Sequence, residues 1–359
     1  MPTLTMPRIN ISFQEAAASY VARSDRGTVL LLLRDAAALA GKTYSLMSAG
    51  EIPAALTEAN QGYVARTFRG YATPPRRVLL YVYDGETKAL TDALAWAATQ
   101  QFDYVCGPAD VSAAEASSIA EWVADQREDN FAIYKAVLPD CAADDYAVVN
   151  FAGAGMTDGT STWTTAAFCS RIAGLLAGTP VRISATYAAL PELTDVTRMT
   201  MEAMDAAVGA GKLILWYDGA VVRTGRAVNS LTTTSATQGD SFKKIKLVAA
   251  MDQTQRDLRS IILTEYIGVY PNSYDNKLVL LTAVRGYFQA LEAQDVVKSG
   301  WVVDLDLDAQ RQWLEDHGVD TGEMTVRELR EADTGSEVFL TANVTYLDAI
   351  EDVTLKITI

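Results

Sequence analysis

The sequence predicts a protein of mixed α/β and α+β class, in which a small outer α/β domain precedes a C-terminal domain of helices packed on a mixed sheet. Strand-like and helix-like segments alternate up to about residue 150, two long runs with apolar residues at helical spacing follow, and both chain ends carry alternating apolar residues. We therefore expect an N-terminal arm at 1–26, an outer domain at 27–160, a second domain at 161–347 and a C-terminal strand arm at 348–359.

The first half of the chain has the pattern of a small α/β layer. Thr28–Leu33 is apolar throughout, which is typical of an interior strand. Ser112 and Glu115 have the spacing of a capping box, which predicts a helix start. The other expected elements are strands at 77–83, 102–106, 131–138 and 146–151, and helices at 54–68, 87–99 and 112–127.

The second half begins with a loop rich in Gly, Ser and Thr at 152–162, which we interpret as a connection between domains. Asp218-Gly219 is a tight-turn signal between two short antiparallel strands. Two helices, at about 242–270 and after Pro271, should pack side by side as the densest core of the chain. The other expected elements are helices at 163–176, 194–208 and 308–316, the last capped by Asp308, and strands at 301–307, 337–347 and 352–359.

The two terminal strands have one apolar face each. At the N-terminus this face consists of Ile9, Ile11 and Phe13, and at the C-terminus of Val353, Leu355, Ile357 and Ile359. Isolated amphipathic strands are unpaired edges that need a cover. They either pair within their own subunit or add to the sheet of a neighbouring subunit, and the residues alone leave both possibilities open.

Composition excludes several classes of function. The net charge of −15 argues against nonspecific nucleic-acid binding. The longest apolar run, Thr28–Leu33, is too short to span a membrane, and no signal peptide opens the chain, so we expect synthesis in a cytosol and no membrane insertion. Cys106, Cys141 and Cys169 are widely spaced and odd in number, which favours buried free thiols.

The polar motifs offer weak signals of chemistry. The single histidine, His317, follows a helix and has no recognisable catalytic partners. Asp304, Asp306, Asp308 and Glu315 have the spacing of a calcium loop, but Ala309 stands where that loop needs glycine. The glycines at 153, 155 and 159 do not have the spacing of a dinucleotide fingerprint. We therefore expect no metal, no cofactor and no catalytic residue.

Lys243, Lys244 and Lys246 form a tight basic cluster in an acidic chain. The simpler interpretation is a solvated face balanced by Asp240 and Asp252. The alternative is a contact with an acidic surface of a partner.

Several stretches together resemble the contractile tail sheath family of myophages, defective phages and phage-tail-like bacteriocins. They are INISFQEAAASYVARSDRGTVLLLL near the N-terminus, GRAVNSLTT, FKKIKLVAAMD, YIGVYPNSYDNK and YFQALE in the second half, and VFLTANVTYLDAIEDVTLKITI at the C-terminus. Their order and spacing cover nearly the whole chain, and residues 50–160 are least like the family.

The resemblance implies a structural subunit, not an enzyme, that polymerises helically around an inner tail tube and contracts to drive the tube through a target envelope. The implied partners are further copies of the chain, the tube protein, and baseplate and tail terminator proteins, in a virion tail or a tail-like particle assembled in a bacterial cytoplasm. It also implies that the terminal arms link subunits and that the three lysines face the tube. The alternative is a soluble cytosolic α/β enzyme with its site in the Gly-rich loop at 151–162.

Overall fold

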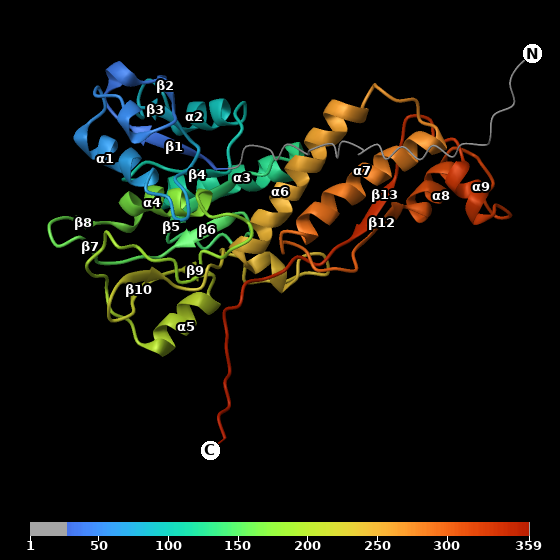
Figure 1. Ribbon diagram of the computed structural model, residues 1–359. Coiled ribbons are helices and arrows are strands. Elements are labelled where there is room, and N and C mark those ends of the chain that lie inside the picture. The colour runs from blue at the N-terminus through green and yellow to red at the C-terminus, as the bar shows by residue number, and fades with distance from the viewer. Residues whose placement is uncertain (1–26, 359) are drawn as a thin grey trace, which may run out of the picture.

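The computed structural model describes residues 27–358, which form two lobes with helix α6 (Ile245–Ile261) between them (Figure 1). The lobe nearer the N-terminus is built on a large sheet, and the other is built from helices and a two-stranded sheet. The C-terminal segment leaves the molecule close to where the lobes meet. Among residues 27–358, none of the helices has the length and apolar character that a membrane span requires.

The first lobe is organised on a seven-stranded sheet with the order β2-β3-β1-β4-β5-β6-β9. The strands are β1 (Thr28–Arg34), β2 (Thr43–Leu46), β3 (Arg77–Tyr83), β4 (Tyr104–Cys106), β5 (Lys135–Pro139), β6 (Val148–Phe151) and β9 (Lys212–Leu213). All neighbouring strands are parallel except β2, which runs antiparallel to β3. β1 lies between two parallel neighbours and is buried along nearly its whole length, as its apolar run predicts.

Helices cover both faces of this sheet. One face packs against α1 (Glu58–Thr67) and α4 (Thr165–Ala177), and the other against α2 (Leu90–Ala97) and α3 (Ala113–Asn130). The helices α1 and α4 approach so closely that a Cβ built on Gly174 would lie 1.9 Å from the carbonyl oxygen of Thr67. All three cysteines are buried and free, as their spacing predicts.

The core of the first lobe continues past residue 160. The cluster that holds the β1 side chains Val29 and Leu31 also contains Phe168 of α4, Leu213 of β9 and Ile245 at the start of α6. Residues 27–160 therefore do not close a core of their own, in contrast to the boundary that the Gly-rich loop suggests. That loop instead forms a small hairpin from β7 (Met156–Thr157) and β8 (Thr162–Trp163).

The second lobe has a smaller core than the first. Its long helices are α6, which continues as a π-helical turn, η4 (Ile262–Tyr266), and α7 (Tyr274–Glu292). These helices are expected from the sequence to form the densest core, but the more extensive clusters of buried residues lie on the two faces of the large sheet. The remaining elements of this lobe are β12 (Val302–Leu305), β13 (Leu340–Asn343), α8 (Leu307–Asp316) and α9 (Val326–Glu331).

Several local expectations are confirmed and two are corrected. The Ser112–Glu115 capping box starts α3, and β10 (Leu215–Tyr217) pairs antiparallel with β11 (Val222–Thr224). Asp306 rather than Asp308 caps α8, because the Asp306 carboxylate accepts a hydrogen bond from the amide of Ala309. The alternating segment 352–358 joins no sheet within the described residues, 27–358. Short elements complete the fold: α5 (Met201–Gly209), η1 (Ala37–Leu39), η2 (Ala49–Glu51) and η3 (Asp240–Lys243).

Candidate assembly site

The C-terminal segment presents an apolar stripe to solvent. Val353, Leu355 and Ile357 are 80%, 78% and 75% exposed, and the segment extends away from both lobes (Figure 1). Alternation at a period of two places these three side chains on one side of an extended chain. Ile359, which continues the pattern, and Ile9, Ile11 and Phe13 of the predicted N-terminal strand lie outside the described residues. A continuous row of exposed apolar side chains indicates a surface that contacts a partner.

Residues 347–352, the root of this segment, are held by ion pairs and hydrogen bonds. The buried carboxylate of Glu351 pairs with Lys244 and accepts a hydrogen bond from the hydroxyl of Thr186 at 2.6 Å. One residue further on, Asp352 pairs with Arg226, with 2.6 Å between Oδ1 and Nη2. The chain is therefore fixed up to residue 352, and the exposed stripe begins immediately after.

The three lysines of the basic cluster have different environments. Lys246 is only 6% exposed and donates to the backbone carbonyl of Leu347. Lys244 pairs with Glu351 and, at 3.0 Å, with Asp348, whereas Lys243 pairs with Asp240 at 3.0 Å.

The structure thus gives Lys244 and Lys246 partners in the chain's own C-terminal segment. Burial lowers the pKa of Lys246, against the opposing effect of the nearby carboxylates. Among the three, Lys243 has the environment closest to the solvated face that the sequence suggests.

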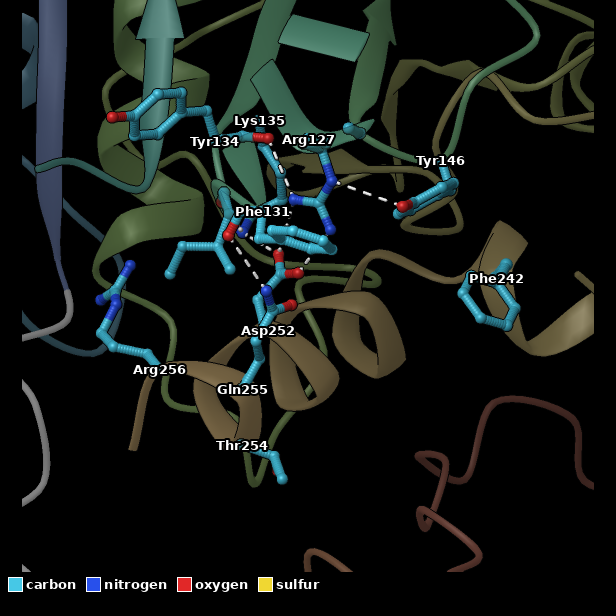
Figure 2. Close-up of polar contacts among 12 residues, drawn as sticks. Arg127, Phe131, Tyr134, Lys135, Tyr146, Phe242, Asp252, Thr254, Gln255 and Arg256 are labelled. Atoms are coloured by element: carbon cyan, nitrogen blue, oxygen red, sulfur yellow. Dashed lines mark hydrogen bonds and ion pairs between the residues drawn. The ribbon is translucent and has the colours of Figure 1, made fainter. Parts of the chain in front are cut away.

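A buried ion cluster joins α6 to the sheet lobe (Figure 2). The carboxylate of Asp252 lies 2.7 Å from Nη2 of Arg127, which comes from α3, and also pairs with Nζ of Lys135, which begins β5. The guanidinium of Arg127 in turn lies over the ring of Tyr146, 4.8 Å from its centroid. All three charged side chains are almost fully buried.

The charges of this cluster determine how its carboxyl group titrates. Burial alone would raise the pKa of Asp252, but the positive charges of Lys135 and Arg127 outweigh burial, and the net result is a lowered pKa. Asp252 is therefore an anion shared by two cations. Such a cluster fixes the position of α6 because removal of one partner leaves a buried charge uncompensated.

The features that could have indicated chemistry are occupied by structural contacts. His317 stacks on Trp313 at 3.8 Å between ring centroids, and its Nδ1 lies 2.7 Å from the carbonyl oxygen of Trp313. Asp304 pairs with Arg330 at 2.6 Å, and no group of acidic, histidine or cysteine residues within 27–358 could hold a metal ion. The calcium spacing therefore reflects a strand followed by a capped helix.

An ion cluster lies at the position where open parallel sheets usually bind ligands. Such ligands bind beyond the carboxyl ends of the strands, where the chain connections diverge to opposite sides. Here that position lies beyond the carboxyl ends of β1 and β4. Arg34 occupies it, paired with Glu115 and, at 2.7 Å, with Asp110.

The sequence did not reveal the pairing of Asp252 with Arg127 and Lys135, which lie 125 and 117 positions away. The sequence carries a signal of this contact, because Asp252, Gln253 and Asp257 interrupt the apolar pattern of α6. In the structure all three side chains are buried. Buried polar residues on a long helix indicate partners in another element.

The fold is that of sheath tail proteins. The sheath tail protein of Desulfitobacterium hafniense superimposes with a TM-score of 0.69 at 17% identity, over 83% of this chain and 94% of that one. The helical sheath of the anti-feeding prophage in its contracted state gives a TM-score of 0.68 at 15% identity, over 99% of both chains.

Sequence similarity defines the family more narrowly. Residues 237–359 match the phage tail sheath C-terminal domain. The tail sheath protein of Clostridium phage phiCD119 is 34% identical over 358 residues, which is 97% of this chain and 98% of that protein. The chain belongs to the tail sheath protein family and is a structural sheath subunit.

Proposed function

We propose that this chain polymerises helically around an inner tail tube and that the sheath contracts to drive the tube through a target envelope. The observation that carries the proposal is the exposed C-terminal stripe, which begins directly after the ion pairs of Glu351 and Asp352. A helical filament requires a contact that repeats without closing, and a projecting segment that reaches a different surface of the next subunit provides one. The particle is a virion tail or tail-like injection device, assembled in a bacterial cytoplasm with baseplate and tail terminator proteins.

The C-terminal segment links subunits by strand addition. Val353, Leu355 and Ile357 each contribute about 1.5–3 kcal/mol when fully buried. Ordering the backbone opposes this by about 1–2 kcal/mol per residue, so the apolar contacts alone leave little net stability. Backbone hydrogen bonds to a neighbour's strand, together with several links per subunit, supply the rest.

A two-stranded sheet in the second lobe is a suitable acceptor. β12 and β13 pair only with each other among the strands of residues 27–358. On the outer edge of β12 the carbonyl of Val303 already accepts hydrogen bonds from Arg285, so the largely exposed β13 offers the freer edge. Val302 of β12 is strongly exposed, which adds an apolar contact on this sheet. The N-terminal strand with Ile9, Ile11 and Phe13 is proposed to make a second link of the same kind.

The role of the basic cluster also belongs to this proposal. Lys243, Lys244 and Lys246 lie at the start of α6, and a tube-facing role for this end of the helix follows from the resemblance. Since Lys244 and Lys246 are held by the C-terminal segment, Lys243 is the member best placed to reach a tube. We also propose that the subunit acts without a cofactor and without catalysis.

The double substitution Leu355→Asp with Ile357→Asp tests strand addition. The variant should fold normally, because both side chains are exposed in the single chain, and should fail to form tubes in electron microscopy. The matched control is Thr354→Asp with Thr358→Asp, which adds the same two charges on the opposite side of the extended chain and should reduce assembly less. Tubes of normal length from the Leu355 and Ile357 variant would refute the proposal.

A further inference from the structure

The first described residues are fastened to α6 through a shared carboxylate. Oδ2 of Asp103, directly before β4, accepts hydrogen bonds from the amides of Gly27 at 2.7 Å and Thr28 at 2.9 Å. Its other oxygen, Oδ1, accepts from Nη2 of Arg256 at 2.6 Å. The root of the N-terminal arm is therefore connected to the later turns of α6 by a buried charged contact.

The root of the C-terminal arm is fastened to the other end of the same helix. Lys246, in the first turn of α6, donates to the carbonyl of Leu347, and Lys244, its N-cap residue, pairs with Asp348 and Glu351. The segments near residues 27 and 347, from which the two arms start, thus share one helix as their support.

The spacing between the two supports is short and rigid. Lys246 and Arg256 lie on one continuous helix, and their separation in sequence corresponds to about 15 Å along its axis. Between them, Asp252 precedes Arg256 by one turn and so lies on the same helix face. Its buried pairs with Lys135 and Arg127 oppose both sliding and rotation of α6 on the sheet.

We propose that α6 sets a fixed distance and orientation between the roots of the two terminal arms, and thereby the geometry of the lattice that the arms build. This inference rests on the proposed function. A force that enters through one arm reaches the other through a short length of helix. The covalent path from residue 27 to residue 347 runs instead through both lobes, so the anchors on α6 provide a shorter route for that force.

Hydrogen exchange on the isolated subunit tests the anchors. Arg256→Gln should speed exchange at the amides of Gly27 and Thr28 about tenfold or more, because Asp103 loses the charge of Arg256. Lys246→Met should do the same at residues 347–351. Arg259→Gln is the matched control, since Arg259 is exposed on the same helix and donates a long hydrogen bond, of 3.5 Å, to the carbonyl of Phe131. Unchanged exchange in the first two variants would overturn the proposal.

Electron microscopy of assembled tubes tests the consequence. Arg256→Gln and Lys246→Met should give tubes of variable diameter or pitch, whereas wild type and Arg259→Gln should give uniform tubes. Uniform tubes from variants with loosened roots would show that α6 does not set the geometry. Should either variant fail to fold, the milder changes Arg256→Lys and Lys244→Gln replace them, with smaller effects expected in the same direction. If wild type itself forms no tubes, the proposed function fails, while the exchange rates still decide whether α6 holds the two roots.

Discussion

Replacing Asp252 by Asn should strongly destabilise the subunit while leaving its shape almost unchanged. The substitution keeps the size of the side chain and removes its charge, so Lys135 and Arg127 remain buried without their shared anion. Breaking a buried ion pair by removing one partner costs about 3–5 kcal/mol. Whole domains are stable by only about 5–15 kcal/mol, so the loss should be plain in urea denaturation followed by tryptophan fluorescence.

A matched control separates burial from charge. Asp240→Asn removes the same charge from an exposed carboxylate that pairs with Lys243 at 3.0 Å, and this change should have no measurable effect on stability. Equal losses in the two variants would show that the cluster around Asp252 does not hold α6 as the structure indicates.

The effect of Asp252→Asn should also depend on pH in a defined direction. The folded state lowers the pKa of Asp252 below its ordinary value, so its charge contributes full stability above that value. The contribution is lost as pH falls through the lower folded pKa. The stability difference between wild type and variant should therefore shrink progressively below about pH 4. A difference that grows in acid would contradict this assignment of charges.

Two further predictions concern helices. Gly174→Ala should lower the free energy of unfolding by about 1–3 kcal/mol in the same denaturation assay, because its Cβ would meet the backbone of Thr67. Gly286→Ala in α7 has open space around its Cβ and should raise the free energy of unfolding by up to about 1 kcal/mol. Ser112→Ala should lower the free energy of unfolding by about 1 kcal/mol, because it removes the N-cap of α3. A decrease smaller than the error of the assay would show that the capping box is dispensable.

Local patterns predicted the first lobe well because each of its elements carries its own signal. The predicted strand Arg77–Tyr83 has the same bounds as β3. A strand that is buried on both faces is a continuous apolar run, and its flanking residues are more polar. The helix that begins after Ser112 was equally clear, because a cap and an acidic residue three positions later satisfy amides within one turn.

Long-range relations were not predictable in the same way. Leu213 joins the large sheet as β9 although it follows a Gly-rich loop and two helices, and no local pattern specifies that pairing. Similarly, the alternation at 352–358 marks an amphipathic segment, but alternation cannot say which sheet receives it. For the candidate site, the sequence identified the stripe at Val353, Leu355 and Ile357 and missed the partners of Lys246 and Asp252, which depend on tertiary packing.

The burial of all three thiols has a practical consequence. Burial raises the pKa of Cys106 and Cys169, so neither is a ready nucleophile for alkylating reagents. A single substitution such as Glu86→Cys, in an exposed turn of the sheet lobe, would therefore give the chain one readily reactive position. Every copy in an assembled particle would then carry one dye, enzyme or mineral-nucleating group at a regular repeat, and of the native cysteines only Cys141, which lines a surface pocket, would need replacement.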